Sequence, residues 1–329
     1  MKSIETIKGF ISGNINPGWS RDRIIKIDGS STVYPITRAI AIAEQFQKAK
    51  RGTVKITVGI SGTGGGFKKF CRGEIDISNA SRPILKKEID ACGEAGIKYV
   101  ELPIAYDGIA VVVNVKNENV IAMTAADLKK IWEPVAEKKV TRWNHVKPMW
   151  PETPLKLYAP GVDSGTFDYF TEAIVGKFGS SRNDFTPNAN HNSLVQGITA
   201  DKDALGFLGY AYYAENKKKL GVVLIDGGNG FLFPSEETVM DGKYQPLSRP
   251  AFIYVNKRSA ERPEVKEFVE FYFRNASRLV RQANYFPLSD RAYRLTVERF
   301  TKGVTGTVFK GEARVGMRIE DLVKLMQPH

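Results

Sequence analysis

Segments with a strand pattern and segments with a helix pattern alternate along most of this chain, and this alternation restricts the fold more than any other feature. A β-branched run at 23–30 leads into an apolar stripe at helical spacing that begins near Pro35. There follow a strand pattern at 55–60, a loop opening a helix at 61–73, a strand at 76–81 and a helix at 82–96. Such alternation is typical of a mostly parallel sheet covered by helices on both faces.

Two long apolar strand patterns, at 101–114 and 247–256, enclose a middle segment with elements of its own. These elements are a helix at 124–132 capped by Thr124, a strand at 155–160, a turn and helix at 161–176, and strands at 204–213 and 221–226. Three further helix patterns close the chain. At 329 residues the chain is longer than a single hydrophobic core usually accommodates. We therefore predict a two-lobed α/β fold, with lobe I formed by 1–115 and 246–329, lobe II by 116–245, and a ligand cleft at the two hinge crossings.

The charge and hydropathy of the chain exclude several classes of protein. No stretch approaches 18 uninterrupted apolar residues, so we expect no membrane-spanning helix. Lysine and arginine number 48 against 36 acidic residues, a net charge of +12. The lysines form scattered pairs without interleaved aromatic residues, which is not the pattern of a base-stacking platform. We expect no nucleic-acid partner and interpret the positive charge as solvated faces that favour a small anion.

The few cysteines and histidines indicate neither a metal site nor a cofactor. Cys71 and Cys92 lack the C-x-x-C spacing, and the chain has three histidines, so a closed zinc site is not expected. From the residues alone, the two cysteines are either a disulfide or two buried thiols.

Three turns resemble one another: DGSSTVYP at 28–35, SGTGGG at 61–66 and DSGT at 163–166. Each follows a strand pattern, carries Ser, Thr and Gly, and precedes a helix. The first backbone N–H groups of a helix lack partners and carry partial positive charge, and hydroxyl groups add further donors. Glycine lets the main chain approach a ligand without a Cβ clash. Three such turns divided between two lobes predict a shared site for a compact oxyanion.

Known phosphate and nucleophile motifs do not fit these turns. A P-loop requires Ser or Thr after its lysine, and here Gly66 is followed by Phe67 and Lys68. The dinucleotide pattern G-x-G-x-x-G fails at Phe67, and G-x-S-x-G is absent. The sequence also lacks a His-paired nucleophile pattern, so binding without catalysis is favoured over a phosphatase.

Two arginines are candidates for contact with an oxyanion, because a guanidinium offers a planar fork of donors. Arg82 ends the strand pattern at 76–81, where ligand clefts form in α/β sheets, and Arg182 follows the helix at 161–176. The alternative for each is an ordinary surface position.

The segments DGSSTVYPIT, GISGTGGGFKKFCRGEIDISNASRPI, PGVDSGTFDYFTEAI, ALGFLGYAYY and YQPLSRPAFIYV resemble the phosphate-binding proteins of bacterial ABC transporters. The resemblance runs from about residue 24 to the C-terminus. It implies a two-lobed fold that closes on phosphate and delivers it to a membrane permease. The family's ligand positions map onto Ser31 or Thr32, onto Thr63 with Ser61 and Gly64, and onto Ser164, Gly165 and Thr166.

Two departures from the best-described branch of that family affect the expected site. Pro160 stands where that branch has an arginine, and Arg82 stands where it has the aspartate that accepts a phosphate proton. The resemblance therefore implies that Arg82, with Arg182, supplies the positive charge. Asp163 and Asp107 are the carboxylates considered as proton acceptors, each with a structural alternative as a helix cap or at a strand end.

The resemblance also implies a monomeric protein without cofactor, exported to the periplasm or another extracytoplasmic space with the leader absent from this chain. It favours a Cys71–Cys92 disulfide over free thiols. A binding protein for another oxyanion, such as sulfate, molybdate or a phosphonate, is the nearest alternative function.

Overall fold

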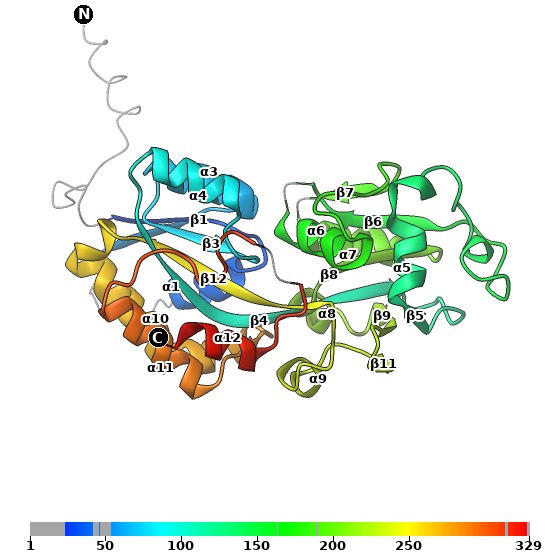
Figure 1. The fold of residues 1–329 in the computed structure, drawn as a ribbon. Helices are drawn as coiled ribbons and strands as arrows, with labels where there is room; N and C mark the ends of the chain where they lie inside the picture. The colour runs from blue at the N-terminus through cyan, green and yellow to red at the C-terminus, as the bar shows by residue number, and fades with distance from the viewer. Residues whose placement is uncertain are drawn as a thin grey trace, which may run out of the picture.

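Two long antiparallel strands join two lobes (Figure 1). The computed structural model describes residues 24–41, 46, 54–162, 164–188, 190–312 and 315–327. Strands β4 (Tyr99–Asn114) and β12 (Ser248–Asn256) pair along the whole of β12, from Ser248 opposite Gly108 to Asn256 opposite Tyr99. Both strands are buried along their whole length, as the apolar patterns predicted.

Lobe I is a sheet with helices on both faces. Its strand order is β2–β1–β3–β12–β4, with β1 (Ile24–Gly29) parallel to both β2 (Lys55–Val58) and β3 (Ile77–Ala80). Helices α3 (Gly62–Cys71) and α4 (Lys86–Glu94) lie on one face, and α1 (Tyr34–Ala41), α10 (Pro263–Gln282) and α11 (Asp290–Thr301) lie on the other (Figure 1). The short β13 (Phe286–Pro287) and helix α12 (Ile319–Met326) complete the lobe.

Lobe II continues the same sheet through β4, whose second half pairs with β8 (Ala204–Gly209). Strand β6 (Lys156–Pro160) is parallel to β8 and to β7 (Thr186–Asn188), and β9 (Leu220–Val222) also pairs with β4. A small sheet contains β5 (Ala122–Thr124), β10 (Leu224–Asp226) and β11 (Phe231–Leu232). The helices are α5 (Ala125–Trp132), α6 (Gly165–Phe170), α7 (His191–Ala200), α8 (Tyr210–Glu215) and α9 (Glu236–Met240), and α6 continues as a π-helical segment over Thr171–Val175.

Local sequence explains where the key helices begin. The Thr124 hydroxyl accepts the N–H of Asp127 at 3.1 Å, so the predicted cap of α5 is confirmed. Helix α3 starts at Gly62, inside the glycine run, where φ is +76° and glycine is favoured. A Cβ on Gly66 would lie 2.6 Å from the Cα of Gly29, so this glycine serves the close packing of α3 on β1.

The strand predicted at 204–213 is shorter than expected. β8 ends at Gly209, and the next residues form α8. Tertiary contacts override the local pattern here: the ring of Tyr210 packs 5.0 Å from that of Phe286, and the ring of Tyr212 lies 4.5 Å from that of His191.

The predicted two-lobed α/β fold with mixed sheets and two crossings is confirmed, whereas the residue limits of the lobes stay a prediction. Among the described helices, none combines the length and apolar character needed to cross a bilayer.

Candidate anion-binding site between the lobes

The turns predicted from the sequence meet where the lobes face each other. Thr32 follows β1 in lobe I, and Thr166 lies in the first turn of α6 in lobe II. Their hydroxyl oxygens are 2.9 Å apart, and both side chains are buried. Segments separated by 134 positions in the sequence therefore share one polar junction.

The start of α3 reaches the same junction. A Cβ on Gly165 would lie 2.5 Å from Oγ1 of Thr63 and 2.3 Å from Oγ of Ser81. These two hydroxyl oxygens are themselves 3.1 Å apart. Gly165 therefore has to be glycine for α6 to approach α3 and the end of β3 this closely.

The remaining predicted hydroxyl groups lie at the edge of this junction and are half-buried. Ser164 caps α6, since its hydroxyl accepts the N–H of Thr166 at 3.1 Å. The carbonyl of Ser31 accepts a hydrogen bond from the hydroxyl of Tyr212 at 3.4 Å, again between the lobes. Ser61 donates its hydroxyl proton to Asp28 at 2.9 Å, so this side chain holds the turn before α3.

Arg249 is the residue of this junction that sequence reasoning missed. Its side chain is 0% exposed on β12. One terminal nitrogen, Nη2, donates to Thr166 Oγ1 at 2.8 Å and to Thr32 Oγ1 at 3.3 Å, and the other donates to the carbonyl of Gly165 at 2.5 Å. An arginine within an otherwise apolar buried strand was the available sign, because such a charge is rarely buried without a specific partner.

The partner of Arg249 is Asp107 on β4. The Asp107 carboxylate lies 3.0 Å from Nη2 of Arg249, and both side chains are fully buried. Burial raises the pKa of Asp107, and the positive charge of Arg249 opposes that rise. Because both residues lie on the crossing strands, the ion pair is placed at the hinge side of the junction.

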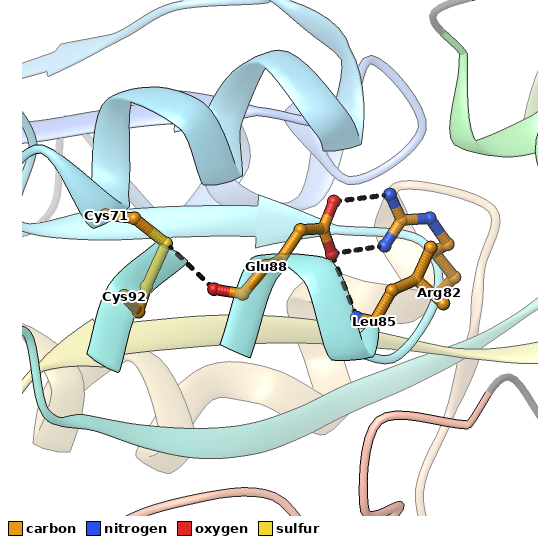
Figure 2. The surroundings of a disulfide bond; sticks show 5 residues. All are labelled: Cys71, Arg82, Leu85, Glu88 and Cys92. Carbon is orange, nitrogen blue, oxygen red and sulfur yellow. Dashed lines mark hydrogen bonds and ion pairs between the residues drawn. A yellow bond between two sulfur atoms is a disulfide. The ribbon is translucent and has the colours of Figure 1, made fainter. Parts of the chain in front are cut away.

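Arg82 is engaged elsewhere. Its two terminal nitrogens donate to the two carboxylate oxygens of Glu88, each at 2.8 Å (Figure 2). Nη1 also donates to the carbonyl of Pro83 at 3.1 Å. Its Nε lies 3.6 Å from Oδ2 of Asp168 on α6. Its guanidinium lies near the predicted turn at 61–66: a Cβ placed on Gly64 would lie 3.9 Å from Nη2.

Arg182 lies apart from the junction. Its guanidinium donates to the carboxylate of Asp184 and to the carbonyls of Ile131 and Val140, so it ties segments of lobe II together. The structure therefore does not bring Arg182 to the turns with which the sequence grouped it. Asp163 lies outside the described residues.

The predicted disulfide is present. Cys71 at the end of α3 and Cys92 in α4 are joined by an S–S bond of 2.04 Å (Figure 2). The bond fixes α4 against α3 on the face of lobe I next to Arg82. Glu88 of α4 also accepts the N–H of Leu85 at 2.9 Å, which caps the start of α4.

A cavity of 660 Å³ opens beside the junction and is lined by both lobes. Lobe I contributes Gly64 and Arg82, and lobe II contributes Val162, Asp168 and Phe178. The Phe178 ring lies 5.4 Å from the Arg82 guanidinium carbon. The predicted turn at 61–66, through Ser61 and Gly64, thus adjoins a space open to solvent that both lobes line.

A two-lobed α/β fold with two strand crossings, and with donor-rich helix starts from both lobes meeting at the crossing, defines a substrate-binding protein that holds its ligand between its lobes. The family model for the PBP superfamily domain matches residues 16–276 of the sequence, so the chain belongs to that superfamily.

Named relatives and a solved structure agree with this assignment. Protein SphX of Synechococcus elongatus is 50% identical over 302 residues, covering 92% of this chain and 88% of the relative. Phosphate-binding protein PstS of Staphylococcus saprophyticus is 36% identical over 283 residues, covering 85% of each chain. The crystal structure of a possible phosphate binding protein from Planctomyces limnophilus is 44% identical, with a TM-score of 0.65, covering 85% of this chain and 98% of that chain. The resemblance seen in the sequence is confirmed.

Proposed function

We propose that this protein binds inorganic phosphate between its lobes and delivers it to the permease of an ABC transporter. The observation that carries the proposal is the meeting of hydroxyl groups from both lobes, Thr32 with Thr166 and Thr63 beside Gly165, around the buried guanidinium of Arg249. A relative named phosphate-binding protein PstS, 36% identical to this chain, supports the choice of ligand.

The proposed ligand set follows from the donors at the junction. Phosphate must lose its water in the closed protein, which is unfavourable unless nearly every oxygen meets a donor. Backbone N–H groups at the starts of α3 and α6 and the neighbouring hydroxyls supply these donors. The proposed contacts are Ser31, Thr32, Thr63, Gly64, Ser164, Gly165 and Thr166.

We assign the positive charge of the site to Arg249 in place of Arg82 and Arg182. Arg249 already donates to two of the hydroxyl groups, and Asp107 holds its guanidinium in place. Arg82 and Arg182 direct their hydrogen bonds to carboxylates and carbonyls of their own lobes. A partly neutralised arginine suits a site that must also release its ligand.

We infer that the protein binds phosphate without catalysing a reaction, as its family consists of substrate-binding proteins. We also propose that it acts as a monomer outside the cytoplasm, in the periplasm where the cell has one. The Cys71–Cys92 disulfide supports an oxidising compartment. The lobe limits proposed are 1–115 with 246–329, and 116–245.

Isothermal titration calorimetry with phosphate, and with sulfate as competitor, tests this proposal. We expect phosphate to bind with a stoichiometry of one and sulfate to compete weakly. Sulfate binding as tight as phosphate binding would show that the substrate assignment is wrong. Release of product from a phosphate ester, abolished by Ser164→Ala, would instead favour an enzyme.

A further inference from the structure

Three buried charged side chains span the two lobes beside the proposed phosphate site. Arg82 and Glu88 belong to lobe I, and Asp168 belongs to α6 of lobe II. Arg82 is 2% exposed, and the side chains of Glu88 and Asp168 are about one-tenth exposed. Asp168 lies two residues after Thr166, the last residue of the predicted turn at 163–166. Its position relative to lobe I therefore changes whenever the start of α6 moves.

The charges in this cluster are not balanced. Glu88 takes both terminal nitrogens of Arg82 in a two-pronged ion pair within lobe I. Asp168 reaches only Nε, at 3.6 Å, and that nitrogen makes no hydrogen bond. Lobe II therefore adds a second carboxylate to an arginine that is already paired, and one negative charge is left in excess.

The other charged groups near Asp168 do not remove this excess. Lys87 is exposed on α4 and places its Nζ 5.7 Å from the Phe178 ring centre. Lys68 and Arg72 line the same cavity from α3 and the residue after it. Glu172, in the π-helical segment after α6, adds another negative charge that senses Arg82. Burial raises the pKa of Asp168, and the opposing charge of Lys87 is the smallest of the effects on that carboxyl and does not offset this rise.

We propose that Asp168 is a positioning residue that opposes closure of the lobes when it is ionised and permits closure when it is protonated, so that it sets how readily bound phosphate is released. This inference rests on the proposed function, because it requires the lobes to open and close around phosphate. Asp168 acts through Arg82 and does not belong to the proposed ligand set.

The titration of Asp168 agrees with the geometry. Burial raises its pKa from 3.8 to about 6, Arg82 partly offsets the rise, and Glu88 adds to it. When the lobes open, water reaches the carboxylate and its pKa falls toward the ordinary value. Closure therefore takes up a proton between these two values, and acid favours the closed form.

The test compares phosphate affinity and dissociation rate of wild type and Asp168→Asn at pH 5 and pH 7.5. Phosphate itself titrates in this range, so the quantity compared is the ratio of the two proteins' phosphate affinities measured at the same pH. We expect wild type to gain about tenfold in affinity relative to Asp168→Asn on going from pH 7.5 to pH 5. At pH 7.5 the variant should release phosphate more slowly than wild type, by at least about threefold.

Asp184→Asn is the matched control, because Asp184 pairs with a buried arginine inside lobe II and does not reach lobe I. Its affinity ratio to wild type should not change with pH. A constant ratio for Asp168→Asn, or weaker binding by this variant at pH 7.5, would overturn the proposal.

A second measurement separates this proposal from the proposed function. Exposed Lys156 in lobe II and exposed Lys266 in lobe I can be replaced by cysteine and spin-labelled with the native disulfide intact. The mean label distance without ligand should be shorter at pH 5 than at pH 7.5 in wild type, and equal at both in Asp168→Asn. If wild type fails to bind phosphate, the proposed function fails, and this distance still decides the role of Asp168. A label distance in wild type that is the same at both pH values would disprove the proposed role of Asp168.

Discussion

The hydroxyl groups of Thr32 and Thr166 lie 2.9 Å apart across the two lobes, and a single nitrogen of Arg249 donates to both. Three segments from distant parts of the sequence thus share one set of hydrogen bonds. Such a shared set depends on the relative position of the lobes, so changes to its members should alter ligand affinity and lobe closure together.

Arg249→Met should lower phosphate affinity by about thirtyfold or more, because a hydrogen bond to a charged group contributes about 2 kcal/mol. The same change leaves Asp107 buried without its partner, which should lower the free energy of unfolding by about 3 kcal/mol. The double variant Asp107→Asn/Arg249→Met should recover much of the stability without recovering binding. Calorimetric titration and denaturant unfolding measure the two quantities. If Arg249→Met bound phosphate as tightly as wild type, Arg249 would not belong to the phosphate site.

Gly165→Ala should prevent full closure, because its Cβ would lie 2.3 Å from Ser81 Oγ and 2.5 Å from Thr63 Oγ1. We expect at least a tenfold loss of phosphate affinity, with a near-normal melting temperature, since each lobe can still fold. Gly93→Ala in α4 is the control: a Cβ there meets nothing within 4 Å, and alanine favours a helix. Equal affinities for the two variants would contradict the packing described here.

Loss of the Cys71–Cys92 disulfide should lower the free energy of unfolding by about 3 kcal/mol, since the bond closes a loop between residues 21 positions apart. The variant Cys71→Ala/Cys92→Ala, unfolded in urea beside wild type, measures this difference. Phosphate affinity should change little, because the proposed ligand set does not include α4. A loss of affinity larger than tenfold would show that α4 takes part in binding.

Acidification should destabilise the protein partly through His191. Its side chain is 2% exposed, neither ring nitrogen has a hydrogen-bond partner, and burial lowers its pKa to about 3, with Arg249 adding to the shift. The unfolded chain therefore binds a proton below pH 6.5 that the folded chain does not, and stability falls as the pH drops. The loss should be about 2 kcal/mol between pH 7.5 and pH 5. His191→Phe should have a flatter profile, and an unchanged profile would exclude His191.

The Ser/Thr/Gly turns could be predicted because their information is local. Each consists of a strand end, Ser, Thr and Gly residues, and a helix start within about ten residues, and such patterns are visible in a single sequence. The disulfide was favoured by the family resemblance. The two-lobed fold was predicted from the two long apolar strands and from the same resemblance. The alternation of strands and helices did not show that 210–213 would form α8, because contacts with Phe286 and His191 decide that turn.

The arginines could not be assigned from local patterns. Arg249 and Asp107 are 142 positions apart, and only the antiparallel register of β12 on β4 places them opposite each other. Arg82 ends a strand as a ligand residue would, yet Glu88 six positions later takes its hydrogen bonds. A sequence shows which side chains carry charge, whereas the pairing of strands and helices determines which charges remain free.

Strand β4 pairs with β12 through its first half and with β8 through its second half, so a single ladder of hydrogen bonds runs through both lobes. Its register with β12 shifts between Ala251 and Phe252, so that Phe252 faces Pro103 and the intervening residue of β4 bulges out. Bending between the lobes must therefore twist a continuous sheet instead of flexing a loose linker. A slip of one residue along β4 would turn Asp107 to the opposite face of the sheet. Arg249 would then lose its carboxylate partner, and the pairing that forms the hinge would change in the same step.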